Sequence, residues 1–229
     1  MKKTLLAVLL AAAFAPSVAM AEQGDWVVRL RAAHISPDED SNLRARTADG
    51  ATTLTGELTV DSNTIPELDI SYYVTKNIAL ELILATGSKH DVNLTKRAIN
   101  GVPTPSLDAN LGEVNVLPPT LTVQWHFNPD QMVDPYVGVG VNYTRFLDKN
   151  LSHPVGGDID VDRNSWGPAL QAGVDINLKD GWQINADVKK LWIDTDVHFS
   201  HGNGLFPKQK IDSLDIDPWV FAVGFGKKF

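Results

Sequence analysis

The sequence predicts an all-β protein: an eight-stranded antiparallel up-and-down transmembrane β-barrel with short periplasmic turns and long extracellular loops. Eight segments of about ten residues or more alternate apolar and polar side chains, which is the period of a β-strand. Strands of this length match a tilted crossing of a bilayer. The connections between the segments are alternately short and long, and all six tryptophans lie on the apolar faces of the segments.

Residues 1–21 are predicted to be a secretory signal peptide. Two lysines precede the apolar run TLLAVLLAAAFA, and the small residues AMA form a cleavage site. Residues 22–229 are then the barrel domain. Removal of the signal peptide takes two lysines from a chain of net charge −8, which leaves −10 and argues against a nucleic-acid partner. The chain has no cysteine, so no disulfide bond supports the exported fold.

The eight predicted strands follow one another along the mature chain. They are WVVRLRAAHI (26–35), IPELDISYYVT (65–75), IALELILAT (78–86), VNVLPPTLTVQWHF (114–127), YVGVGVNYT (136–144), SWGPALQAGVDINL (165–178), GWQINADVKKLWID (181–194) and DPWVFAVGFGKKF (217–229).

The connections define the two ends of the barrel. KN, NPDQMVD and KDG are short, whereas residues 36–64, 87–113, 147–164 and 195–213 are long. In an outer-membrane barrel the short turns face the periplasm and the long loops face outside. The long connections contain Pro103, Pro105, Pro154, Gly156 and Gly157, which disfavour extended strands there.

The tryptophans distinguish a membrane barrel from a soluble periplasmic β-sandwich. A soluble core would scatter them along its depth, whereas a bilayer places aromatic residues in two girdles at its interfaces. Trp26, Trp125 and Trp182 lie near the predicted short-turn end. Trp166, Trp192 and Trp219 lie toward the predicted long-loop end, so two girdles are expected.

The polar face of the strands becomes the lumen, and it carries both signs of charge. The expected lumen charge network consists of Arg29, Arg31, Glu67, Asp69, Glu81, Asp175 and Asp187, with Lys189 and Lys228 on the same face. Buried charges must pair, and eight strands enclose a space that side chains can fill. A structural plug is therefore favoured over an ion-selective pore.

Pro118 and Pro119 stand together inside the fourth predicted strand. Proline has no N–H to donate to a ladder, so two backbone acceptors on neighbouring strands lose their partners. Such groups facing lipid are costly. The pair is either a β-bulge near the rim or a local gap in the wall through which an apolar solute could leave.

Several motifs resemble those of the outer-membrane protein W (OmpW) family over essentially the whole mature chain. They are NIALELILATGSKH, LPPTLTVQWHF, PYVGVGVNYT, SWGPALQAGVD and the ending DPWVFAVGFGKKF. The terminal Phe229 resembles the signal that the barrel-assembly machinery reads in many outer-membrane families.

The resemblance implies a function and a site. It implies an outer-membrane channel for passive uptake of small hydrophobic molecules, which enter between the loops and leave laterally through the wall at Pro118 and Pro119. Ile83 falls where members carry an apolar residue that constricts the lumen. Lys189 occupies a position that is aromatic in some members, so an apolar seal at that level is in doubt. The expected partners are outer-membrane lipid, the barrel-assembly machinery and small hydrophobic solutes.

Other classes of function have weaker support. His198 and His201 are spaced as metal ligands but fall in a predicted flexible loop without an obvious third ligand, so no metal site and no cofactor are expected. An enzyme would need a nucleophile and a base, and Ser88 with His90 or Ser152 with His153 are neighbours in sequence only. Because these pairs are weak evidence, the chain is expected not to be an enzyme.

A structural or adhesion barrel is the remaining alternative. Such a protein needs loops that protrude and are extended like strands.

Overall fold

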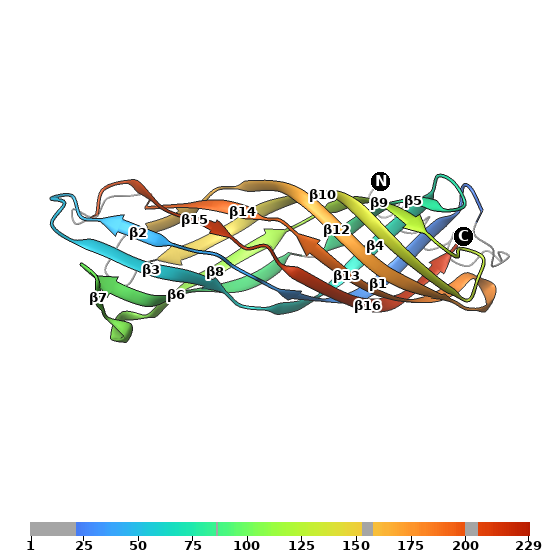
Figure 1. The fold of residues 1–229 in the computed structure, drawn as a ribbon, viewed down its shortest axis with the longest axis horizontal. Coiled ribbons are helices and arrows are strands. Elements are labelled where there is room, and N and C mark those ends of the chain that lie inside the picture. The colour runs from blue at the N-terminus through green and yellow to red at the C-terminus, as the bar shows by residue number, and fades with distance from the viewer. Residues whose placement is uncertain (1–21, 86, 153–157, 200–205) are drawn as a thin grey trace, which may run out of the picture.

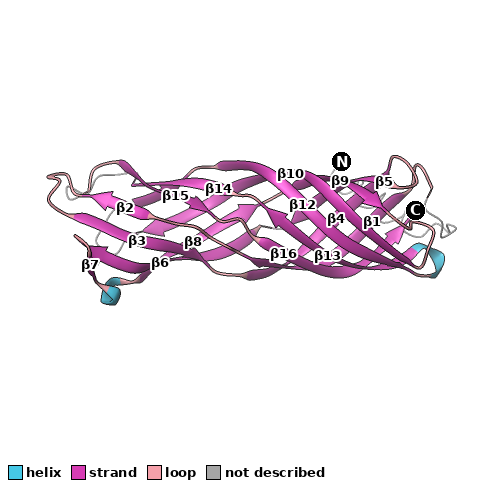
Figure 2. Ribbon diagram, viewed as in Figure 1, coloured by secondary structure: helices cyan, strands magenta, loops and turns pink. Residues whose placement is uncertain are grey.

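The computed structural model describes residues 22–85, 87–152, 158–199 and 206–229, which form one long β-cylinder (Figures 1 and 2). The predicted signal peptide lies outside the described residues. Within the described residues no helix has the length and apolar character of a membrane span. The only helical elements described there are the short 3₁₀ turns η1 (Pro105–Leu107) and η2 (Lys179–Gly181).

Eight antiparallel strands form a closed ring, which confirms the predicted fold class. In ring order they are β1 (Trp26–Ser36), β4 (Asn63–Tyr73), β5 (Ile78–Ala85), β9 (Thr120–His126), β10 (Val133–Ser152), β12 (Asn164–Asn177), β13 (Trp182–Leu191) and β16 (Trp219–Lys228). β16 pairs with β1 from Val27–Lys228 to Ser36–Trp219, so the ring has no edge. Closure gives every strand two neighbours, which a bilayer requires because lipid offers no hydrogen-bond partner.

The long connections are not irregular loops, and the prediction that prolines and glycines keep them from forming strands was wrong. They contain β2 (Leu43–Arg46), β3 (Thr53–Val60), β6 (Ser88–Ile99), β7 (Val102–Pro103), β8 (Ala109–Leu117), β11 (Asp158–Val161), β14 (Asp194–Phe199) and β15 (Gln209–Asp215). Pro103 and Pro105 lie at a hairpin tip, in β7 and at the start of η1, where a proline interrupts no central ladder. Pro154, Gly156 and Gly157 lie outside the described residues.

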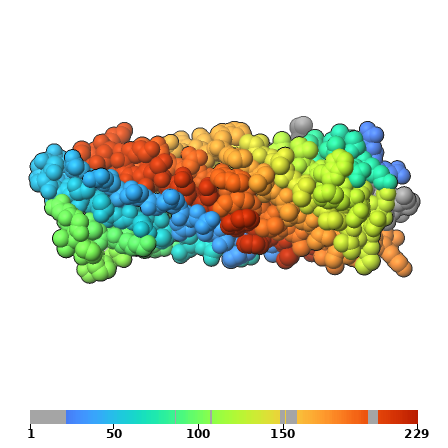
Figure 3. All heavy atoms as spheres, viewed as in Figure 1, coloured from blue at the N-terminus to red at the C-terminus, as the bar shows by residue number. Residues whose placement is uncertain are grey.

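These strands continue the barrel as a second ring, which we call the outer section. β10 runs through both rings, pairing with β8 on one side and β11 on the other, and β8 continues through β6 and β3 to β2. β11 continues through β14 to β15. An Asp40–Asp215 bridge lies between the two ends, and the Gln209 side chain bonds both the N–H and the carbonyl of Arg46. The outer-section strands gather at one end of the cylinder, opposite the short turns (Figures 1 and 3).

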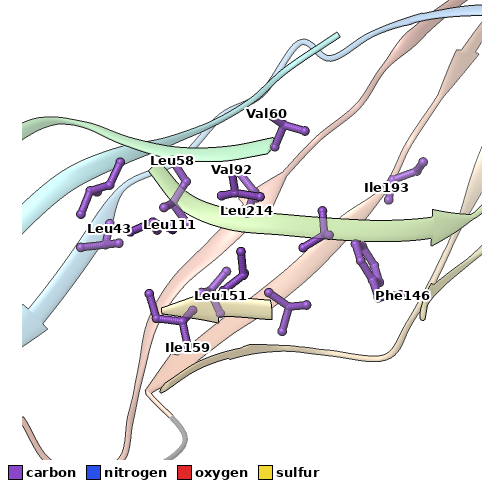
Figure 4. Packing of buried hydrophobic residues seen from close by; sticks show 14 of the residues in the cluster. Leu43, Leu58, Val60, Val92, Leu111, Phe146, Leu151, Ile159, Ile193 and Leu214 are labelled. Carbon is purple, nitrogen blue, oxygen red and sulfur yellow. The ribbon is translucent and has the colours of Figure 1, made fainter. Parts of the chain in front are cut away.

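Side chains alternate between the outside and the inside of the cylinder. Around the membrane ring the outward face is apolar, with Leu30, Val139 and Phe225 each at least half exposed. In the outer section the apolar side chains point inward instead and pack into one cluster (Figure 4). The two rings therefore have opposite polarity, because lipid surrounds one and water surrounds the other.

Five of the six tryptophans lie on the outward face of the membrane ring. Their exposed fractions are 50% for Trp26, 48% for Trp125, 66% for Trp166, 44% for Trp182 and 42% for Trp219. Trp192 differs: it lies just past the end of β13 and is half-buried, and its N–H donates to the Pro168 carbonyl at 3.2 Å. The membrane interfaces expected from these residues remain a proposal.

Glycine permits close approach of strands inside the ring. A Cβ atom on Gly140 would lie 2.1 Å from the backbone oxygen of Leu121, whereas one on Gly138 would lie 2.9 Å from the side-chain oxygen of Gln171. We expect Gly140→Ala to lower the free energy of unfolding by about 1–3 kcal/mol more than Gly138→Ala, because a backbone atom cannot turn aside. Urea unfolding of the two variants in detergent micelles would measure this difference, and equal losses would contradict the close approach of Gly140 to Leu121.

Candidate functional site

An apolar cavity lies inside the cylinder where the membrane ring meets the outer section. Its lining is Ala33, Ile35, Pro37, Val60, Ile65, Glu67, Ile83, Ala85, His90, Val114, Val116, Pro118, Thr120, Thr144, Phe146, Lys189, Leu191, Ile193, Ile216, Pro218 and Val220. The centre of a water molecule could move through about 60 Å³ inside this cavity. By the same measure, one water needs about 10–15 Å³, so the cavity can hold a larger molecule. We call this cavity the chamber.

A second apolar cavity lies on the outer side of the chamber. Leu58, Leu111 and Leu214 line it, and it shares four apolar side chains with the chamber. The shared residues are Val60, Val114, Phe146 and Ile216. A continuous apolar interior therefore leads from the outer section to the chamber (Figure 4).

Ion pairs form the floor of the chamber. Arg31 binds Glu67 at 2.6 Å and Asp69 at 2.8 Å, while Lys189 binds Asp187 at 2.7 Å and Glu67 at 3.2 Å. All five side chains are almost completely buried. Lys189 and Ile83, expected as lumen constrictions, both line the chamber. The floor at Lys189 is thus ionic rather than an apolar seal.

The remaining charges of the predicted network lie in contact with these. Arg29 is fully buried and pairs with Asp175 at 2.7 Å, and its other terminal nitrogen lies 3.5 Å from Glu81. Glu81 also accepts a 2.7 Å hydrogen bond from the Gln171 amide. The structure therefore brings all seven predicted charges and Lys189 together; we call this cluster the plug.

Sequence reasoning missed the other polar members of the plug. His126 Nδ1 lies 2.7 Å from Asp134, and the Tyr136 hydroxyl donates to Asp187 at 2.9 Å. Tyr73 contacts His126 through its hydroxyl at 3.2 Å. The inward parity of His126 and Tyr136 in their strands was the available signal, but their partners lie on other strands and could not be read from it.

Pro118 and Pro119 lie between β8 and β9, at the point where pairing of β5 with β9 ends and pairing of β6 with β8 has not yet begun. β5 pairs with β9 as far as Ile83–Thr120, and β6 pairs with β8 from Ser88–Val116 onward. Among the described residues no ladder pair joins these two points, and the register shifts by one residue across them. Pro118 lines the chamber at this interruption.

On the other side of Pro118 and Pro119, the ladder with β10 is continuous. β10 pairs in one register with Thr120 below and Leu117 above, and the Tyr143 N–H donates to the Pro119 carbonyl at 3.0 Å. The Asn142 amide bonds Thr120 Oγ1 at 2.8 Å and the Pro118 carbonyl at 3.3 Å. The ladder is therefore interrupted only toward β5 and β6. The Pro118 carbonyl accepts its hydrogen bond from the Asn142 side chain inside the barrel.

Ser88 and His90 lie at the start of β6, beside this interruption, and His90 lines the chamber. Ser88 Oγ is 2.7 Å from His90 Nε2, and His90 Nδ1 is 2.7 Å from the Asp61 carbonyl. A carbonyl only accepts, so Nδ1 carries the proton and Nε2 accepts from Ser88. Burial lowers the pKa of His90, which keeps the ring neutral. Ser88 and His90, which are close in sequence, are thus also in contact in the structure. The Ser152 side chain and His153 lie outside the described part of the chain.

The structure also places Phe229 and His198, two further residues singled out from the sequence. Phe229 exchanges both backbone hydrogen bonds with Trp26, at 2.8 and 3.0 Å, and so ends the seam between the last and first strands. His198 lies in strand β14, so its prediction within a flexible loop was wrong, and His201 lies outside the described residues.

The fold and site define an eight-stranded outer-membrane β-barrel whose interior is a polar plug beneath an apolar chamber. The model of the OmpW family matches residues 22–229, and the chain belongs to that family. It is 34% identical to outer membrane protein W of Vibrio cholerae, over the full length of both chains. The crystal structure of OprG from Pseudomonas aeruginosa is 31% identical and superposes with a TM-score of 0.76, covering 93% of this chain and 99% of OprG. The chain is also 24% identical to a Pseudomonas aeruginosa protein named dibenzothiophene metabolism operon protein PahQ, covering 91% of this chain and 90% of PahQ.

The plug allows a direct test of its ion pairs. Arg31→Met leaves Glu67 and Asp69 without their closest cation, so we expect the free energy of unfolding to fall by about 3–5 kcal/mol. Lys76→Met, which removes an exposed ion pair with Asp130 at a periplasmic turn, should change it little. Urea titration in lipid vesicles measures both, and a similar small loss in both variants would argue against a stabilising plug.

Proposed function

We propose that this protein is a passive channel through which small hydrophobic molecules cross the outer membrane. Solute enters between the outer-section hairpins, occupies the chamber, and leaves sideways into the membrane at Pro118 and Pro119. The observation that carries the proposal is the position of the ladder interruption. It lies in the wall of an apolar chamber whose floor is closed by ion pairs.

The chamber favours apolar solutes over polar ones. Most of its lining is aliphatic, and its threonines are already hydrogen-bonded: Thr120 to Asn142, and Thr144 to the same amide group at 2.6 Å. A polar solute would lose water without gaining partners, which is costly. An apolar solute gains about 25 cal/mol for each Å² that it buries.

The plug supports a lateral rather than a periplasmic exit. An apolar solute that continued downward would have to separate buried ion pairs such as Arg31–Glu67 and Arg29–Asp175. Breaking a buried pair leaves an uncompensated charge and costs several kcal/mol. Movement through the wall instead opens a region where, among the described residues, no ladder bonds must be broken.

The family context is consistent with this proposal. The relative PahQ is named for dibenzothiophene metabolism, and dibenzothiophene is an apolar aromatic compound. We extend that chemical class, but no particular compound, to this chain. The proposal includes no catalytic step and no cofactor. In it, the five exposed tryptophans anchor the ring at the membrane interfaces. Phe229 forms part of the signal for barrel assembly.

A structural or adhesion barrel is the second candidate. The extension of the long connections into strands of the outer section favours it, because such a protein presents strands above the membrane. The uptake experiments below separate the two candidates, since an adhesion barrel has no effect on entry of apolar solutes.

The lateral exit is tested by restoring backbone donors. In intact cells at matched barrel abundance, we expect Pro118→Thr with Pro119→Val to reduce uptake of naphthalene to that of cells without the protein. Pro135→Thr replaces a proline near the short-turn end of β10, in register with Val174 and well below the interruption, and should retain native uptake. Unchanged uptake in the double variant would place the route through the lumen.

The chamber is tested by filling it. Ala85 lines the chamber, whereas Leu80 is 41% exposed on the outer face of the same strand, below the interruption, where it still pairs with Val123. We expect Ala85→Trp to abolish facilitated naphthalene uptake because the indole occupies the space of the solute. Leu80→Trp adds the same side chain toward lipid and should leave uptake near native. If native protein itself does not accelerate uptake, the channel proposal fails and the structural barrel replaces it.

A further inference from the structure

Carboxylates and a histidine gather on the outward face of β14 and of the end of β11, with Asp162 directly after that strand. The two strands pair with Asp160 opposite His198, and the next residue pair brings the Asp162 N–H to the Asp196 carbonyl at 3.0 Å. Asp162 and Asp196 therefore face each other directly across the ladder. Like charges directly opposite each other destabilise a sheet, and Lys210 Nζ, 2.6 Å from Asp196, offsets part of this repulsion.

The three side chains have the geometry of a metal site. One ligand atom from each of Asp162, Asp196 and His198 lies within 4.8 Å of the other two, and His198 Nε2 is 3.7 Å from Asp162 Oδ1. Ligands at about 2.0–2.2 Å from a common ion lie about 3–4 Å apart, so small rotations about the side-chain bonds bring all three into place. The strands themselves supply a rigid base.

The surroundings keep the ligands available. The side chains of Asp162, His198 and Asp196 are 60%, 34% and 35% exposed, so an ion can arrive from solvent and retain water in its open positions. Lys210 and Ser213 both bond Oδ1 of Asp196, which leaves Oδ2 for an ion.

We propose that Asp162, Asp196 and His198 form a binding site for a divalent transition-metal ion of the zinc class on the outer surface of the protein. Two carboxylates and one imidazole suit such ions better than calcium or magnesium, which prefer oxygen ligands alone. The bound ion offsets the Asp162–Asp196 repulsion and joins two strands from different connections. Val161 and Val197 on the inner faces of those strands line the outer apolar cavity, so the ion stabilises the entrance to the chamber.

The test is titration of the untagged mature protein in detergent micelles with ZnCl₂ by calorimetry, with CoCl₂ absorption as a spectroscopic readout. Native protein is expected to bind one ion per chain at this site. His198→Asn and Asp162→Asn are each expected to weaken binding at least about tenfold. Lys210→Met removes a competing cation and is expected to tighten binding. His34→Asn, at an exposed histidine of β1 bonded to Thr64, is the matched control and is expected to leave it unchanged.

The outcomes are decisive because the site lies outside the membrane ring and its variants keep the barrel, which heat-modifiable migration in electrophoresis verifies. Absence of saturable Zn²⁺ binding to native protein overturns the proposal. Binding that His198→Asn and Asp162→Asn leave unchanged also overturns it, because the ion then lies elsewhere. Transport activity does not enter the readout, so failure of the metal site and failure of the channel are distinguishable.

Discussion

The structure depends on one constraint: in hydrocarbon, backbone hydrogen-bonding groups must find their partners within the protein. The pairing of β16 with β1 meets this constraint by closing the ring, and the Phe229–Trp26 exchange completes it at the seam. Closure then fixes which face of each strand meets lipid and which meets the interior. A ladder interruption in such a wall is costly, and here it lies at Pro118, beside the chamber.

Closure also divides the interior by depth. The inward side chains of the lower membrane ring are charged or polar, and with little water available they stabilise the barrel only when paired, as Arg29 is with Asp175. The inward side chains of the outer section are aliphatic and pack on one another, with Phe146 at the junction. The chamber lies at the boundary between these two regions, where neither ion pairs nor close apolar packing fills the space.

The outer section shows how a barrel extends beyond its membrane. Once water replaces lipid outside, the apolar face turns inward, and the strands keep the ladder by adding neighbours around β10. Charges can then occupy the outside, and the acidic faces of β11 and β14 are one result. The same continuation encloses the apolar interior above the chamber, which irregular loops would leave open to water.

The sequence by itself determined the ring and the facing of its residues. Period-two alternation identified all eight membrane strands, and parity placed Arg29, Glu81 and Asp187 in the lumen. Only the tertiary structure decided depth and partnership: that Arg31 meets Glu67, that Ser88 contacts His90, and that Pro118 borders a cavity. It also decided that the long connections form a second ring. The physical reason is that alternation reports which face a residue occupies, whereas strand tilt and register, set by closure of the whole ring, decide its height and its neighbours.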